Sequence, residues 1–271
     1  MKLPTLFISH GGGPWPWLYD FETENPYSKL AAYLKEFPKK LEARPKAIII
    51  ISAHWEESQF TAMTSAHPPM VYDYFGFPKH TTQVKYAAPG AAPLVPHIKE
   101  LMAAAGMTLR EDPSRGYDHG TFVPLFMMFP EANIPVLQLS MKNNYDPIKH
   151  IKLGQILAPL RDAGVLIIGS GHSYHNLNFS ELKVTQNSQT FDAWLTQTLC
   201  EAEPAERIKQ LVNWSAAPLA QKAHPKADHL VPLFVAAGAS PLGKGQKGFS
   251  GCFPLMEGVT PWEVSCFEFW G

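Results

Sequence analysis

The sequence predicts an α/β fold: a single globular domain whose central sheet, mostly parallel or mixed, is flanked by helices. Three observations predict it. Apolar, β-rich runs alternate with helical patterns along the chain. Continuous Ile runs, such as residues 48–51, are typical of strands covered on both faces. No linker-like stretch of Gly, Ser or charge divides the 271 residues, so we expect one domain over residues 1–271.

The individual elements follow from local composition. Apolar runs rich in β-branched residues predict strands over 5–9, 46–52, 134–140 and 165–170. Helical spacing predicts helices over 25–43, 92–106, 146–164 and 227–239, with a helical region from 188 to about 217. The tail over 248–271 is expected to hold one or two strands. The Pro-rich stretch 67–78 is expected to be a loop and, because long irregular loops are often functional, a lid that faces a substrate.

Charge and composition favour a small-molecule partner. Lys and Arg number 23 and Asp and Glu 24, a net charge of -1, which favours neither nucleic acid nor an anionic membrane surface as a partner. The N-terminal apolar run is too short for a signal peptide, and no run reaches the roughly 20 apolar residues of a membrane span, so we expect a cytoplasmic protein. The three cysteines form no C-x-x-C pair, which argues against a disulfide framework or a thiolate zinc site.

Histidines gather where the predicted strands end. His10, in SHGGG, is expected just past the first strand and His54, in SAHWE, just past the second. Further histidines follow the strand over 165–170 or lie in loops: His119, His172, His175, His224 and His229. Open α/β sheets build their sites at strand carboxyl ends, and imidazole is both a common metal ligand and a proton carrier. The pattern therefore predicts a metal site with an acid/base neighbour.

The three glycines after His10 do not form a known phosphate loop. SHGGGP lacks the G-K-[ST] ending of a P-loop and the G-x-G-x-x-G spacing of a dinucleotide fold. Glycines that let backbone and ligand approach a metal-bound histidine fit the pattern better.

Five ordered motifs resemble a known family. SHGGGP, SAHWE, GYDHG, IIGSGHSYHNL and DHLVPLFVAAGA, spread over residues 9–239, resemble the class III extradiol ring-cleavage dioxygenases of the LigB type. The branch they most resemble is that of the 4,5-DOPA extradiol dioxygenase-like proteins. The resemblance implies that His10 and His54 bind a metal, with His229 as third ligand where other branches have a glutamate. It implies further that His175 is the catalytic acid/base and that His119 contacts substrate.

The resemblance also implies the reaction. One divalent metal ion per chain is expected, Fe(II) for activity, with a catechol such as DOPA and O2 as substrates. Three ligands on one face of the ion leave positions for both reactants. The same ligands suit zinc, which can occupy the site in a preparation. Two alternatives stay open: a zinc hydrolase with His175 or Glu56 as base, and a non-catalytic binding protein on the same fold.

Several neighbouring residues have two interpretations. Asp118 either orients His119 or serves as a helix cap or turn residue. His172 and His224 are expected to be surface histidines or to lie behind the site. Aromatic residues near the motifs either wall a flat substrate or belong to the core: Trp15, Trp17, Trp55, Tyr72, Tyr74 and Phe75.

Overall fold

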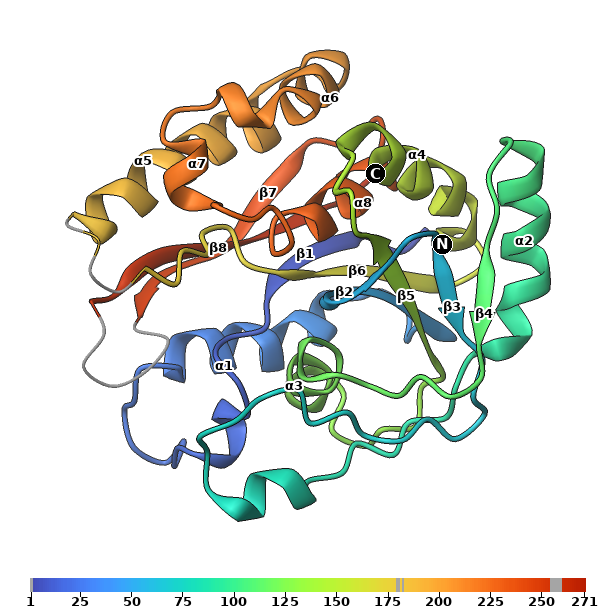
Figure 1. The fold of residues 1–271 in the computed structure, drawn as a ribbon, viewed down its shortest axis with the longest axis horizontal. Coiled ribbons are helices and arrows are strands. Elements are labelled where there is room, and N and C mark those ends of the chain that lie inside the picture. The colour runs from blue at the N-terminus through green and yellow to red at the C-terminus, as the bar shows by residue number, and fades with distance from the viewer. Residues whose placement is uncertain (1, 179–180, 182, 254–259) are drawn as a thin grey trace.

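A mixed sheet forms the centre of the molecule (Figure 1). The computed structural model describes residues 2–178, 181, 183–253 and 260–271. Within them eight strands pair in the order β4-β3-β5-β2-β6-β1-β8-β7. Their bounds are β1 Thr5–Ser9, β2 Ala47–Glu57, β3 Thr61–Met63, β4 Arg110–Asp112, β5 Val136–Lys142, β6 Val165–Gly171, β7 Gly245–Phe253 and β8 Trp262–Phe269. The central strands β5, β2, β6 and β1 are parallel, whereas β8 and β7 extend the sheet antiparallel. The predicted α/β class is confirmed.

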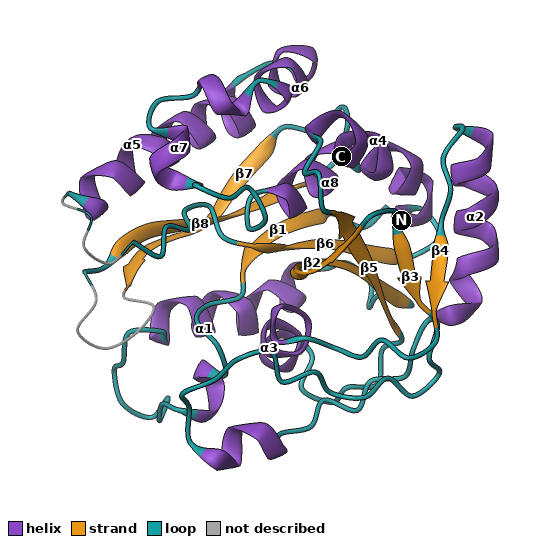
Figure 2. Cartoon of the chain, viewed as in Figure 1, coloured by secondary structure: helices purple, strands orange, loops and turns teal. Residues whose placement is uncertain are grey.

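Helices cover both faces of this sheet (Figure 2). Helices α1 (Ser28–Glu36) and α3 (His119–Met128) lie on one face, and α4 (Pro147–Leu157) and α8 (Val231–Gly238) on the other. Residues 48–51 are fully buried between the two layers, as their continuous Ile run predicts. The remaining helices are α2 Val95–Ala104, α5 Val184–Thr196, α6 Pro204–Val212 and α7 Ala220–Ala223.

Most predicted elements occur at nearly their predicted bounds. The strand over 5–9 is β1, and the helices predicted over 92–106, 146–164 and 227–239 are α2, α4 and α8, each shortened at its ends. The helix predicted over 25–43 stops at Glu36 and continues as a 3-10 helix, Phe37–Lys40. The predicted tail holds β8 and most of β7, and its residues 254–259 lie outside the described residues.

The position predicted for His54 is wrong. Strand β2 runs on to Glu57, so His54 lies inside the strand and not past its end. Pairing of β2 with β6 stops at Ser52, and pairing with β5 shifts register between Ile51 and Glu56. His54 thus occupies a stretch of strand that has left both ladders, at the carboxyl edge of the parallel strands.

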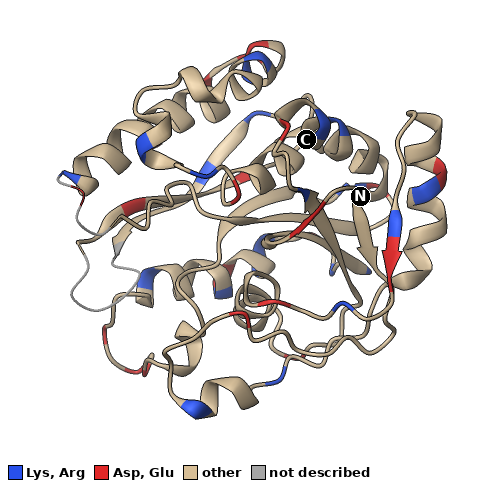
Figure 3. Cartoon of the chain, viewed as in Figure 1, with Lys and Arg blue, Asp and Glu red and all other residues tan. Residues whose placement is uncertain are grey.

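Charged residues of both signs are interspersed over helices and loops in the view of Figure 3. This mixture is in keeping with the net charge of -1. Among the described residues, no helix is both long enough and apolar enough to cross a membrane.

Candidate metal centre and active site

The three glycines after β1 turn the chain so that His10 faces a pocket. Gly11 and Gly13 have φ angles of +75° and +55°, in a backbone region that residues other than glycine rarely adopt. A Cβ atom at Gly11 would lie 2.3 Å from the indole nitrogen of Trp15, which donates a 2.7 Å hydrogen bond to the carbonyl oxygen of His10. The glycines therefore serve a tight turn closed by Trp15.

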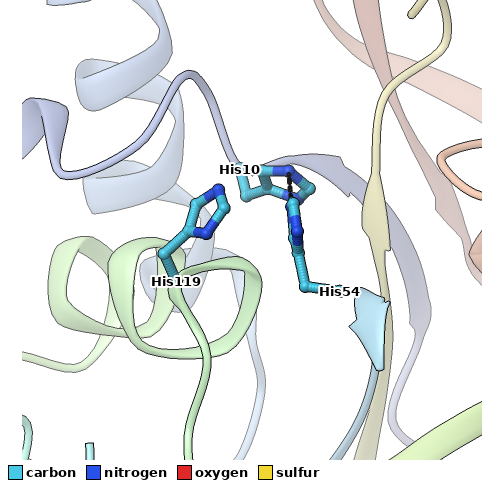
Figure 4. A group of neighbouring side chains, drawn as sticks. All are labelled: His10, His54 and His119. Carbon is cyan, nitrogen blue, oxygen red and sulfur yellow. Dashed lines mark hydrogen bonds between the residues drawn. The ribbon is translucent and has the colours of Figure 1, made fainter. Parts of the chain in front are cut away.

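Six histidines surround one pocket of about 140 Å³. It is lined by His10, Gly11, Gly12, Gly13, His54, His119, His172, His175 and His229. All five residues singled out as ligands or catalysts from the sequence are thus brought together, from the turn after β1, from β2 and α3, and from the segments that follow β6 and precede α8. Figure 4 shows His10, His54 and His119 converging from three separate elements.

His10 and His54 point their Nε2 atoms at each other, 3.1 Å apart (Figure 4). Ser170 donates its hydroxyl proton to the carbonyl oxygen of Gly120, so its oxygen accepts from Nδ1–H of His10 at 3.1 Å. The Nε2 atom of His10 is therefore unprotonated and faces the pocket. Nδ1 of His54 lies 3.3 Å from Oδ2 of Asp73.

Two carboxylates hold His119 and His229 in the same manner. Oδ1 of Asp73 accepts from the backbone N–H and from Nδ1 of His119, at 3.0 and 2.8 Å. Oδ1 of Asp228 accepts from the backbone N–H and from Nδ1 of His229, at 2.7 and 2.9 Å. In both residues Nδ1 carries the proton and Nε2 is free to bind, which is the arrangement common to metal-ligating histidines.

Gly171 lets the segment that carries His229 approach the end of β6. A Cβ atom at Gly171 would lie 2.1 Å from the carbonyl oxygen of His229. The backbone N–H of His172 donates to that same oxygen at 2.9 Å. Any larger residue at position 171 would push His229 away from the pocket.

His175 lies against His229 and keeps its ring nitrogens free. The two rings are stacked, with centroids 3.5 Å apart and an interplanar angle of 14°. Within the described residues neither ring nitrogen of His175 has a hydrogen-bond partner. Burial, aided by the neighbouring His119, lowers the pKa of His175 to about 4. The ring is thus available to take up a proton from a ligand.

His172 and His224 are buried and not surface residues. Nε2 of His172 donates to the carbonyl oxygen of Gly11 at 3.2 Å, and its Nδ1 accepts from the hydroxyl of Ser9 at 3.1 Å. Both nitrogens are thus used to fasten the glycine turn to β6. His224 bonds to the carbonyl oxygen of Ser173 at 3.0 Å. His224 thus lies behind the site, whereas His172 also lines the pocket.

The donor set fits a divalent metal ion. Burial, reinforced by neighbouring histidines, lowers the pKa of His10, His54 and His229 well below the ordinary value, so these rings are neutral near pH 7. Two nitrogen ligands at about 2.0–2.1 Å from one ion, in near-tetrahedral or tighter geometry, lie about 3.0–3.4 Å apart. The 3.1 Å between the Nε2 atoms of His10 and His54 falls in that range.

Two histidines, His119 and His229, lie close enough to His10 and His54 to be considered as the third metal ligand. Ligand atoms of His10, His54 and His119 all lie within 4.8 Å of one another, and those of His175, Asp228 and His229 form a second such group. The ring of His229, the ligand that the resemblance implies, has its centroid 5.3 Å from that of His10 and 5.0 Å from that of His54. Both histidines are therefore placed beside the pair.

Asp118 is a helix cap and not the partner of His119. Its side chain accepts from the backbone N–H of Thr121 at the start of α3, and from the hydroxyl of Ser52 at 2.6 Å. The carboxylate that holds the His119 ring is Asp73, which the sequence analysis did not single out. No motif marks Asp73; the one sequence signal is its place in the loop over 67–78, chosen there as a lid.

The aromatic candidates are divided between core and rim. Trp15 and Trp55 are buried, and Phe75 is 94% exposed. The ring of Tyr74 has its centroid 5.8 Å from that of His119. Glu56, considered as a base, has one oxygen 2.8 Å from Lys226 Nζ and accepts from the hydroxyl of Tyr145 with the other.

Comparison with known proteins shows the family of the chain. Residues 4–251 match the family described as the catalytic LigB subunit of aromatic ring-opening dioxygenase. The chain is 40% identical over 243 residues to "4,5-DOPA dioxygenase extradiol" of Beta vulgaris, which covers 87% of this chain and 86% of the relative. It is 34% identical over 259 residues to "Dioxygenase tasH" of Hapsidospora irregularis, covering 88% of this chain and 78% of that one.

A solved structure has the same fold. The crystal structure of an uncharacterized protein from Escherichia coli K12 superposes with a TM-score of 0.77 at 25% identity, covering 99% of this chain and 100% of that one. The match over residues 4–251, the identity to the curated relatives and the histidine pocket together identify the chain as an enzyme of the LigB family of aromatic ring-opening dioxygenases.

Proposed function

We propose that the protein is an Fe(II)-dependent extradiol dioxygenase that opens the ring of a catechol such as DOPA with O2 to give a semialdehyde. His10, His54 and His229 are the metal ligands in this proposal, His175 is the acid/base, and His119 contacts the substrate or oxygen. The observation that carries the proposal is the pocket of neutral histidines in which Nε2 of His10 lies 3.1 Å from Nε2 of His54.

The ligands and the proton carrier have separate roles. Bound ferrous iron supplies the redox chemistry that brings a catechol and O2 to react, which zinc lacks. Binding a catechol through its oxygens requires the loss of phenolic protons, and opening the ring requires that a proton be returned. The free ring of His175 accepts the first and returns the second. His119, fixed with its proton on Nδ1, presents Nε2 as an acceptor for a phenolic O–H of the substrate.

The size of the pocket favours a small flat substrate. A volume of about 140 Å³ suits a single aromatic ring, and the glycine turn forms one wall without side chains. The relatives named for 4,5-DOPA make DOPA the first catechol to try.

Metal exchange tests the proposal against the zinc-hydrolase and binding-protein alternatives. Metal-free protein is loaded anaerobically with ferrous iron or with zinc, then exposed in air to DOPA and a panel of simpler catechols. We expect a yellow ring-opened semialdehyde with iron and none with zinc. Hydrolysis of a catechol ester by the zinc form, without ring opening by the iron form, would contradict the proposal.

A further inference from the structure

Asp73 contacts two of the pocket histidines at once. It lies in the irregular segment between β3 and α2, and so comes from a different part of the chain than either histidine. Its Oδ1 accepts two hydrogen bonds from His119, and its Oδ2 lies 3.3 Å from Nδ1 of His54. The two imidazole rings that share this carboxylate have centroids 3.9 Å apart.

We propose that Asp73 is a positioning residue that fixes His54 and His119 together in the tautomer with Nδ1 protonated, so that both Nε2 atoms face the metal pocket. The inference rests on the proposed metal site and concerns how that site is held. A carboxylate can accept hydrogen bonds at both of its oxygens, and with Oδ1 on His119 its Oδ2 is left facing Nδ1 of His54 at 3.3 Å. The partners of ligating histidines set their tautomer and orientation in this way.

An amide in place of this carboxylate cannot serve both rings. Asparagine has one accepting oxygen, and its nitrogen only donates. If the oxygen of the amide serves His119, its nitrogen faces Nδ1 of His54 and drives the proton of that ring to Nε2, where it blocks a metal bond. If the amide turns round, His119 loses its acceptor in the same way. The first orientation keeps an acceptor for two donors of His119, its backbone N–H and Nδ1, so Asp73→Asn is expected to disable His54, a metal ligand in the proposal.

Asp228 supplies a matched control. It too lies beside the pocket and holds a histidine, but its second oxygen faces the half-exposed Lys226 at 3.3 Å and no second ring. An amide at position 228 keeps its oxygen on both donors of His229 and turns its nitrogen toward Lys226, which can move into solvent. Asp73→Asn and Asp228→Asn remove the same charge from the same site, so a difference between them reports on the shared carboxylate.

The experiment measures zinc affinity by competition with a chromophoric chelator, for the wild type and both variants. We expect Asp73→Asn to bind zinc 10- to 100-fold more weakly than the wild type, which is the range found when the hydrogen-bond partner of a metal ligand is lost. The loss of zinc affinity in Asp228→Asn is expected to be at least tenfold smaller. Wild-type affinity in Asp73→Asn would overturn the inference. Equal losses in both variants would also overturn it, because loss of charge alone would then explain them.

A measurement on the unaltered protein keeps the test decisive if Asp73→Asn does not fold. Nitrogen NMR of the zinc-loaded wild type is expected to show His54 and His119 both protonated on Nδ1. A proton on Nε2 of His119 would refute the shared tautomer. Zinc binding is measured whether or not the iron form opens a catechol, so failure of the proposed activity and failure of this inference give different results.

Discussion

Removing the side chain of Asp118 is expected to destabilise the protein strongly. The carboxylate is fully buried and accepts from four donors: Ser52 and Arg115 at 2.6 Å, the backbone N–H of Thr121 at 3.1 Å, and the amide of Gln138. Burial raises the pKa of Asp118, so its charge is itself costly in the core. Stability is lost on truncation to alanine because the four donors stay buried away from water and no longer have an acceptor.

The magnitude follows from what Asp118→Ala leaves behind. Loss of a helix cap costs about 1 kcal/mol, and breaking a buried ion pair by removing one partner costs about 3–5 kcal/mol. Because one carboxylate makes both interactions, the two costs do not simply add. We expect a loss of about 4 kcal/mol, a large part of the roughly 5–15 kcal/mol that stabilises a typical domain. With a urea m-value of about 3 kcal/mol/M, the midpoint falls by somewhat more than about 1 M.

Urea unfolding of metal-free protein measures this loss. Asp20→Ala is the control, because Asp20 is exposed and its carboxylate accepts a backbone N–H from Glu22. The control is expected to change stability by less than about 1 kcal/mol. A loss below about 1 kcal/mol in Asp118→Ala as well would refute the view that this carboxylate organises the start of α3.

The remaining predictions concern the site and the pH dependence of stability. His175→Ala should retain bound metal and lose ring opening, as seen by metal analysis and product absorbance; normal turnover would refute its acid/base role. His229→Ala should lose metal, and His119→Ala should keep it while turnover falls; the reverse pattern in metal analysis would make His119 the third ligand. Burial lowers the pKa of His150 to about 4, although the Asp146 carbonyl opposes the shift. Because an unfolded histidine titrates near 6.5, the folded state binds fewer protons between these values, and stability of up to about 3 kcal/mol is present above pH 6.5 and lost as pH falls toward 4. His150→Gln should flatten this slope in acid unfolding of the metal-free protein, and an unchanged slope would contradict the assignment.

The fold could be predicted where local composition and burial agree. The run over residues 5–9 is apolar and is a fully buried strand, so pattern and structure coincide. Helix α3 was not predicted because HGTFVPLFMM is apolar on nearly every side and contains Pro124, so it shows no polar face. Strands β3 and β4 have three residues each and give no periodic signal.

The candidate site could be predicted in its histidines and not in their supports. Motifs near the ends of the predicted strands mark His10 and His54, because parallel strands bring their carboxyl ends to one edge and His54 lies beyond the paired part of β2. Asp73 has no such mark, since its contact with His119 spans 46 residues and depends on how an irregular loop packs. The two roles weighed for Asp118 were separated by its contacts, because a side chain at a helix start can either cap or reach its neighbour's ring.

Oxygen uptake measures the proposed ring opening directly. Iron-loaded protein is mixed with DOPA in an oxygen-electrode cell, with the zinc-loaded protein and iron-loaded His175→Ala as references. We expect the wild-type iron form to consume one O2 for each catechol lost, with the semialdehyde appearing in equal amount, and neither reference to do so. Iron bound at the histidine pocket without O2 uptake, for DOPA and for every simpler catechol tried, would contradict the proposed dioxygenase activity.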